Sequence, residues 1–533
     1  MSSITTNYTL NQKKVGLALS GGGFRASFFH IGVLSELART GLLSQIDVIS
    51  TVSGGSIIGA YYYLALQKKK NEKKDNLVND DYVEIMDCIS NDFYNTVKKG
   101  IRNRFYIEYV ISNAGLRKKQ ASHVFADLLD QYFFNKFAIN GEKKVTMKQF
   151  CASQGLPKII LNSTNINLGR PCRFTTSLED AITNIYEIAN EITKHHPEGY
   201  KFNYEEMSLG NAVGSSSCVP GLFPPFEIDL DVSVLSLVDG GISDNSGVVA
   251  LLEEKCNYII ISDASLHIDH IHQPSSSITS MLFRTNDIFL EQQKKQIKKD
   301  LNQGFDSVID INIREELTDT IPKYINGKMP STKYNINQLT QHYISKMRTD
   351  LDVFTKLEAN TLMLSGLSIA KLKLVSNEEI FARPFHTSNF LYQFENDSLK
   401  EAVINPPEKY LKFLNAASLK VHKRKKYRMN PHKLFEKKLK KKPLIGFRIS
   451  SLVVALIATL FFYLKAFSGN DLHTPVFVII ISLIFLLFLF LLLAQLYIPI
   501  FLIAIFFYLK MEDKVYQFKA YKYYEKVLIS SSK

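Results

Sequence analysis

Three glycine-containing motifs carry the residue types that serine-dependent acyl transfer requires. They are Gly21-Gly22-Gly23-Phe24-Arg25, Gly54-Gly55-Ser56 and Asp239-Gly240-Gly241. Each follows an apolar run typical of a β-strand, so each motif is expected at one edge of a sheet. A glycine turn, a serine hydroxyl and a lone carboxylate could then meet around one substrate. The sequence therefore predicts a hydrolase.

The glycine turn lies between a short apolar run, 15–19, and an apolar helical run, 24–37. The first N–H groups of a helix have no acceptor within it, and such a terminus attracts negative charge. A tetrahedral acyl intermediate develops that charge on oxygen, and one preorganised donor contributes about 2.7–4 kcal/mol to its stabilisation. The glycines also let a substrate approach the backbone closely.

Ser56 is the predicted nucleophile because of its context. The pattern Gly-x-Ser also occurs at Ser216, Ser243 and Ser368, but only Ser56 follows a clean strand-like run, 46–52, and precedes a helical run, 57–66. That is the context of a nucleophile elbow. The full pattern Gly-x-Ser-x-Gly would place glycine at position 58, where this chain has Ile58. Ser53, beside Gly54 and Gly55, is the alternative nucleophile.

Asp239 is the predicted general base. It ends a strand-like run, and Gly240-Gly241 permits a sharp turn that would leave the carboxylate at the sheet edge. Because the reference pKa of an aspartate is about 4, this carboxylate needs burial or close hydrogen bonding to take a proton from serine. A plain turn aspartate is the alternative, since Asp-Gly dipeptides are common in turns.

The segments around these motifs resemble the signature blocks of patatin-like phospholipases. The resemblance is carried by residues 16–26, 52–56, 161–165, 212–225 and 238–245, in matching order and spacing. It implies a three-layer αβα fold with a mostly parallel central sheet. It also implies cleavage of acyl esters of membrane phospholipids or neutral lipids through an acyl-enzyme. A weaker likeness to bacterial members continues through 348–352.

The resemblance assigns roles by position. Ser56 would be the nucleophile and Asp239 its general-base partner, without a catalytic histidine. The N–H groups of residues 21–23 would form the oxyanion hole, and Arg25 would help to hold that loop or the oxyanion. The sequence shows no metal-ligand constellation, so neither a metal nor another cofactor is expected.

Two competing functions remain open. A Ser-Asp-His hydrolase would need a histidine after Asp239, and a polar loop offers His267, His270 and His272. A membrane-tethered scaffold that binds lipid without turnover is the second alternative, and Ile58 is the feature that favours it. Changing the three histidines to glutamine would leave a dyad active and would inactivate a triad.

Strand-like and helix-like segments alternate through residues 13–397, the predicted catalytic domain, after a polar tail over 1–12. Further strands are expected at 158–161 and 258–261, and further helices at 121–137, 286–301 and 344–374. Such alternation predicts an α/β fold. A basic aromatic region, 97–119, is expected to be a surface helix or a lid.

Two long apolar runs predict a membrane anchor. They lie within 449–509, and each is long enough for about 20 apolar residues to span a bilayer. The second run, 475–509, is expected to be one long span or a span followed by an interfacial helix. A C-terminal transmembrane hairpin is therefore predicted, followed by a tail over 510–533.

Most of the net charge of +13 lies in the juxtamembrane segment 398–448. Between Lys420 and Arg448 the 533-residue chain has thirteen basic residues and one acidic residue, Glu436. Positive charge next to a span predicts a cytoplasmic location for this stretch and for both termini, and attraction to anionic lipid headgroups. No nucleic-acid-binding motif accompanies it, so nucleic acid is not an expected partner. Five dispersed cysteines favour a reducing compartment.

Overall fold

The structure is a computed structural model that describes most of the chain as far as residue 428. The described residues are 13–73, 76–113, 119–139, 141–192, 202–230, 233–265, 268, 277–304, 307–317, 322, 330–377 and 388–428. Among them, no helix is both long enough and apolar enough to cross a bilayer. The predicted spans within 449–509, the tail after them and the basic residues 429–448 lie outside the described part.

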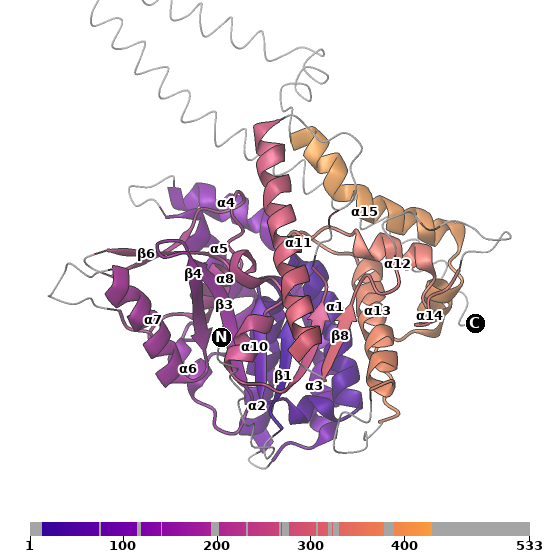
Figure 1. Ribbon diagram of the computed structural model, residues 1–533, viewed down its shortest axis with the longest axis horizontal. Helices are drawn as coiled ribbons and strands as arrows, with labels where there is room; N and C mark the ends of the chain where they lie inside the picture. Colours follow the sequence, from indigo (N-terminus) through magenta and orange to yellow (C-terminus); the bar gives the residue numbers. More distant parts are fainter. Residues whose placement is uncertain are drawn as a thin grey trace, which may run out of the picture. The chain divides into compact units, whose positions relative to one another are not determined.

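A mixed, mostly parallel sheet forms the centre of the domain (Figure 1). In the described chain its eight strands have the order β5-β6-β3-β2-β1-β7-β8, and β4 pairs with β3. The pairs β1–β2, β1–β7, β2–β3 and β7–β8 are parallel, and those that include β4, β5 or β6 are antiparallel. The strands are β1 (Val15–Leu19), β2 (Val48–Val52), β3 (Lys158–Asn165), β4 (Arg170–Thr175), β5 (Phe226–Asp229), β6 (Val234–Asp239), β7 (Tyr258–Asp263) and β8 (Val308–Asn312).

The helices follow the strands in α/β order, as the alternating sequence pattern predicts. They are α1 (Gly23–Arg39), α2 (Gly54–Lys73), α3 (Asn79–Val97), α4 (Ile101–Asn113), α5 (Ala121–Leu129), α6 (Met147–Cys151), α7 (Leu178–Ile192), α8 (Leu209–Ser216), α9 (Gly241–Asp244), α10 (Val248–Glu253), α11 (Ile278–Gly304), α12 (Gln338–Ser345), α13 (Lys356–Val375), α14 (Asp397–Ile404) and α15 (Glu408–Arg428). Short helical turns lie at η1 (Leu42–Gln45), η2 (Asp130–Phe134) and η3 (Asn135–Phe137). The alternating elements therefore form the predicted α/β fold.

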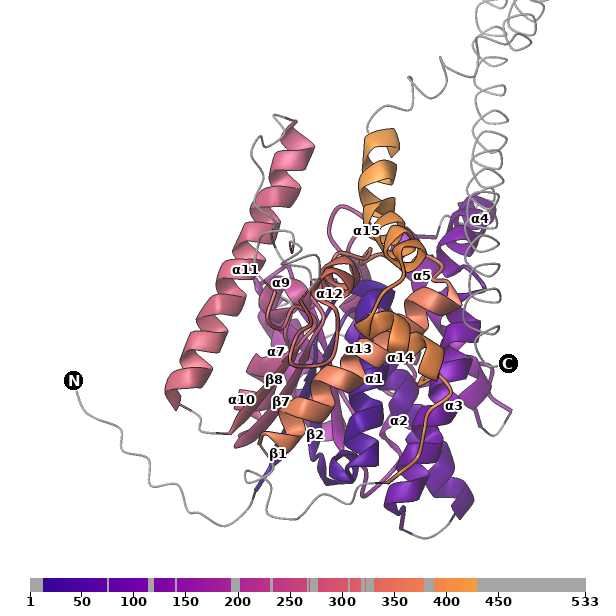
Figure 2. The same ribbon diagram turned by 90° about the vertical axis from the view of Figure 1, so that its right-hand side faces the viewer.

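Alternate residues of the central strands pack into two separate cores. In β1, Leu17 and Leu19 join the larger core beneath α1 and α2, whereas Ala18 faces a smaller core that includes α10. Successive side chains of a strand point to opposite faces, so helices must cover both faces of the sheet. Figure 2 shows α1, α2 and α13 on one side of the strands and α10 and α11 on the other. The fold thus has the three layers that the resemblance implied.

One predicted helix, 344–374, is two helices. α12 ends at Ser345 and α13 begins at Lys356. A capping box starts α13: Thr355 Oγ1 accepts from the N–H of Glu358, and the Glu358 carboxylate accepts from the N–H of Thr355 at 2.7 Å. This reciprocal cap satisfies the backbone N–H groups of Thr355 and Glu358, and it therefore stabilises the start of a new helix at this point. The intervening loop reaches the candidate site.

The compact catalytic unit extends beyond the boundary expected at residue 397. One compact unit includes the described residues as far as Ser418. Leu399, Tyr410 and Leu414, from α14 and α15, are buried in the larger core. The first part of the predicted juxtamembrane segment therefore belongs to the catalytic fold.

Candidate active site

Ser53, rather than Ser56, occupies the tip of the turn between β2 and α2. Its φ angle is 51°, a left-handed conformation that is unusual for a residue with a side chain. The carbonyl of Ser53 accepts hydrogen bonds from the N–H groups of Ser56 and Ile57, at 2.8 and 3.1 Å, and so starts the helix. A strained serine on a sharp strand-to-helix turn is the geometry of a nucleophile elbow.

The elbow packs directly onto the glycine turn after β1. A Cβ atom at Gly54 would overlap the carbonyl group of Gly23, and one at Gly55 would overlap the carbonyl oxygen of Leu19. Only glycine fits where two backbones approach this closely. The two glycines that follow Ser53 therefore set the distance between the elbow and the turn.

The register of β3 brings Asp239 to Ser53. β2 pairs with β3 as far as Val52, which lies opposite Asn162, and the next β3 residue, Ser163, pairs with Asp239 of β6. β4 pairs with one edge of β3 along this stretch. β6 must therefore pair with the other edge of β3, directly after the end of β2. Ser53 and Asp239 consequently meet where β2 ends.

The Asp239 carboxyl group is buried beside the Ser53 hydroxyl. Its Oδ1 accepts a hydrogen bond from the N–H of Gly241 at 2.8 Å. Burial raises the pKa of Asp239 to about 6, and hydrogen bonding from the Ser53 side chain and from Gly241 opposes that rise. Oδ2 makes no fully aligned hydrogen bond to another described residue, so the serine contact is loose, as is common before substrate binds.

The predicted pairing of Ser56 with Asp239 is not what the structure shows. Ser56 is fully buried in the first turn of α2, and its Oγ lies 2.9 Å from Thr51 Oγ1 and 2.8 Å from Ser216 Oγ. A hydroxyl held between two others in the interior cannot reach an acyl ester. Ser56 therefore supports the elbow from below.

Ser216 holds the elbow in place, a role that was not predicted from the sequence. Its Oγ accepts from the N–H of Ser53 at 3.1 Å and donates to the carbonyl of Asn162 at 2.6 Å. The carbonyl of Ser216 also accepts from the N–H of Gly240, at 3.4 Å. One residue thus contacts both the elbow and the Asp239 turn. The family-like block 212–225 was the available signal.

The glycine turn offers two N–H groups rather than three. Gly22 and Gly23 have φ angles of 143° and 58°, which turn the backbone into the start of α1. The N–H of Gly21 donates to the carbonyl of Asn245 at 3.0 Å and is occupied. Within the described chain, the N–H groups of Gly22 and Gly23 donate to no acceptor. These two groups, at a helix N-terminus, are suited to an oxyanion.

Arg25 lies in the interior and ties the glycine turn to later parts of the chain. Its Nη1 donates to the carbonyl groups of Ser345 and Met347, at 2.7 and 3.0 Å, and its Nη2 donates to that of Ala264 at 2.6 Å. Burial lowers the pKa of Arg25 to about 10, which leaves it charged at neutral pH. Of its two predicted roles, this geometry supports holding the loop.

A loop between α12 and α13 covers the glycine turn. A Cβ atom at Gly23 would overlap the carbonyl of Thr349. The loop is fixed by Arg348, whose Nη1 lies 2.5 Å from Glu358 Oε1, and by Arg102 of α4, whose Nη1 lies 2.9 Å from Asp350 Oδ2. These residues were not predicted as part of the site, although the weak likeness at 348–352 pointed to this loop.

Histidine is not paired with the candidate dyad in the described residues. His30, in α1, lies nearby, with Nδ1 2.7 Å from Ser262 Oγ and Nε2 2.9 Å from the carbonyl oxygen of Ser20. Burial lowers the pKa of His30 to about 4, so it is neutral and held on both sides. The histidines of the alternative triad, His267, His270 and His272, lie outside the described residues. No cluster of three metal-ligating side chains occurs in the described part.

An elbow serine, a buried carboxylate and free N–H groups at one edge of an α/β sheet form the arrangement of a serine-type acyl hydrolase. A family model for patatin-like phospholipases matches residues 17–252, which identifies a patatin-like phospholipase domain there, and members of that family are lipid acyl hydrolases. The solved structures that match include the crystal structure of VipD from Legionella pneumophila, at 14% identity and a TM-score of 0.30 over 79% of this chain and 77% of VipD. No curated protein matches the chain.

Proposed function

We propose that the protein hydrolyses acyl esters of membrane lipids with Ser53 as the nucleophile and Asp239 as its general base. The observation that carries the assignment is the register of β3: Val52, the residue before Ser53, lies opposite Asn162, and the next β3 residue, Ser163, pairs with Asp239. The family match supports lipid acyl hydrolysis in general. The elbow geometry supports Ser53 over Ser56.

The reaction proceeds through an acyl-enzyme. Ser53 Oγ attacks the acyl carbonyl carbon while Asp239 takes the hydroxyl proton, and the N–H groups of Gly22 and Gly23 bind the oxyanion. The intermediate collapses as the ester C–O bond breaks, and Asp239 gives its proton to the leaving alcohol. Water then attacks the acyl-enzyme with Asp239 again as base, which releases the fatty acid and restores Ser53.

The departure from the elbow pattern no longer favours an inactive scaffold. With Ser53 as nucleophile, the closing glycine is Gly55, and Ile58 is an ordinary buried core residue. The departure moves to Thr51, which stands where the pattern has its first glycine. The methyl group of Thr51 fits because residue 59 is glycine: a Cβ atom at that position would lie only 2.6 Å from Thr51 Cγ2.

The test compares fatty-acid release by wild type, Ser53→Ala, Asp239→Asn and Ser56→Ala, each purified as the full chain in detergent and assayed on phospholipid vesicles. Loss of the nucleophile or its base is expected to lower kcat by about a thousandfold or more. Ser56→Ala is expected to keep activity within about tenfold and to unfold more easily, because it removes the buried hydrogen bonding of this hydroxyl with Thr51 and Ser216.

The converse result would reverse the assignment. A folded Ser53→Ala enzyme with full activity beside an inactive, equally folded Ser56→Ala enzyme would return the nucleophile to Ser56. No release by folded wild type from phospholipid, lysophospholipid or neutral lipid would contradict the proposed hydrolase.

A further inference from the structure

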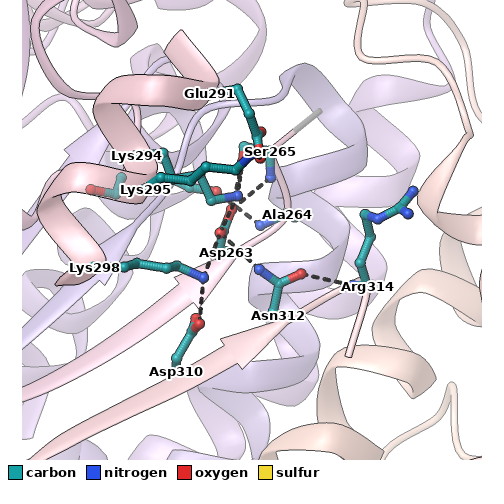
Figure 3. A network of polar contacts seen from close by, with 12 residues as sticks. Asp263, Ala264, Ser265, Glu291, Lys294, Lys295, Lys298, Asp310, Asn312 and Arg314 are labelled. Carbon is teal, nitrogen blue, oxygen red and sulfur yellow. Dashed lines mark hydrogen bonds and ion pairs between the residues drawn. The ribbon is translucent and has the colours of Figure 1, made fainter. Parts of the chain in front are cut away.

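Helix α11 is fixed to the sheet by its second half. Lys294 Nζ lies 2.6 Å from Asp263 Oδ2 and 2.9 Å from Ser265 Oγ, and Lys298 Nζ lies 2.5 Å from Asp310 Oδ2. Figure 3 shows these lysines reaching from the helix to β7 and β8. Because Asp263 is buried and Asp310 is partly buried, these ion pairs hold this half of the helix firmly.

The first half of α11 projects past the sheet on the side where the parallel strands end, which is the side of the candidate site (Figures 1 and 2). It carries large exposed apolar side chains, with Ile278 71% and Phe289 69% exposed. We call these exposed residues the apolar stripe: Ile278, Met281, Leu282, Ile288 and Phe289. At 100° per residue these five lie within about a third of the helix circumference.

This apolar stripe faces away from the domain. The stripe lies opposite the face that bears Glu291, Lys294 and Leu301, which packs against the body of the protein. A helix at the surface of a globular domain normally turns its apolar face inward. The reversed pattern indicates an external partner.

The order of residues along the outward face fits an anionic lipid surface. Lys295, Lys299 and one acidic residue, Asp300, are exposed on the same face as the stripe. Lys295 Nζ also lies 4.0 Å from Glu291 Oε1, so the face keeps a small positive charge. Lys295 follows Phe289 by six residues, about 9 Å of helix rise. In a bilayer the charged headgroups lie about 5–10 Å outward from the acyl chains. The apolar residues near the projecting end of α11 would therefore contact acyl chains, while the lysines farther along the helix would lie at the level of anionic headgroups.

A second apolar group lies on the same side of the domain. Tyr109 and Ile111 of α4, with Val219 and Leu222 in the loop after α8, are exposed. The helix and the loop are joined by the rings of Phe105 and Phe223, 5.3 Å apart. Figures 1 and 2 both show α4 on the side toward which α11 projects.

We propose that the projecting half of α11, residues 278–289, inserts into the anionic lipid surface that carries the substrate and holds the mouth of the site against it. This inference rests on the proposed function, because it names the surface from which that site takes its substrate. The anchor of α11 also adjoins the site: Asp263 precedes Ala264, whose carbonyl oxygen accepts from Arg25 and lies against Gly22. An inserted helix would therefore fix the glycine turn relative to the bilayer.

The absence of tryptophan from the chain provides a clean probe. Phe289→Trp is made in the full chain with Ser53→Ala, so that the lipid is not consumed. The protein is reconstituted into phosphatidylcholine vesicles containing one-fifth phosphatidylglycerol, with bromine on the acyl chains as a fluorescence quencher. The matched control is Phe390→Trp, 38% exposed, whose carbonyl accepts from Arg39 at the opposite end of α1.

Insertion is expected to reduce the fluorescence of Phe289→Trp about twofold or more relative to unbrominated vesicles, and to leave Phe390→Trp unchanged. Equal quenching at both positions, or none at position 289, would overturn the proposal. Blue-shifted but unquenched emission from Phe289→Trp would also overturn it, because the stripe would then be covered by protein, either a second copy or another partner. The readout does not depend on turnover, so it stands even if the proposed hydrolase fails.

A second experiment measures the consequence for catalysis. Met281→Asp with Phe289→Asp, in an otherwise wild-type chain, is expected to slow hydrolysis of vesicle lipid about fivefold or more, since aspartate opposes insertion. Hydrolysis of a monomeric short-chain ester is expected to stay unchanged, and Phe390→Asp is the control. An equal loss on both substrates would contradict a role at the lipid surface. Failure of wild type on both substrates would instead count against the proposed function.

Discussion

The burial of Asp239 sets the expected pH dependence of catalysis. As a general base it must be ionised, and burial raises its pKa to about 6. The kcat/KM of wild type is therefore expected to fall about tenfold per pH unit below pH 6. A pH–rate profile on a soluble ester measures this directly. A profile that stays flat down to pH 4.5 would show that the carboxylate ionises normally.

The same burial predicts a stability difference. The folded pKa is about 6 and the unfolded value about 4, so between these values the folded state binds more protons than the unfolded state. Stability therefore falls as the pH rises through this window, by about 2–3 kcal/mol in all. We expect Asp239→Asn to be more stable than wild type at pH 8, and the gain to vanish near pH 4. Urea unfolding at both pH values tests the sign.

The elbow and the glycine turn act as one element because their backbones touch. Gly55→Ala would place a methyl group against the carbonyl oxygen of Leu19, inside a fully buried contact. We expect a loss of about 3 kcal/mol or more and little activity, since overpacking here moves the elbow. Gly169→Ala is the control, because its φ of 68° imposes strain but its Cβ would meet nothing within 4 Å. Comparable urea midpoints for both variants would show that the backbone around Leu19 moves enough to admit the methyl group.

At the scale of the whole molecule, we propose that the apolar runs within 449–509 anchor the catalytic unit to the membrane, with its basic segment on the cytoplasmic side. The full chain is expected to stay in the membrane pellet after alkaline extraction, and a chain ending at residue 428 is expected to be released. The shorter chain retains all of α14 and α15, whose apolar side chains complete the core. Release of the full chain at alkaline pH would contradict the anchor.

Local patterns predicted the elements well because each reflects short-range chemistry. Apolar runs and glycines located β1, β2 and β6 and the turns after them, and the alternation of elements predicted an α/β fold. The single helix predicted over 344–374 failed because the cap at Thr355 and Glu358 outweighs a continuous apolar pattern. The basic charge in and after α15 led us to assign this segment to the juxtamembrane region, although apolar residues of α15 such as Tyr410 pack into the core of the catalytic fold.

The sequence by itself determined the chemistry of this protein: a glycine turn, an elbow with two serines, and one aspartate at the end of a strand. It left open which serine faces that aspartate, because Ser53 and Ser56 are three residues apart on one turn. Only the tertiary structure decided this, through the register of β3 and the hydrogen bond from the N–H of Ser53 to Ser216 Oγ. Contacts between segments far apart in the chain aim a side chain, and local patterns do not encode them.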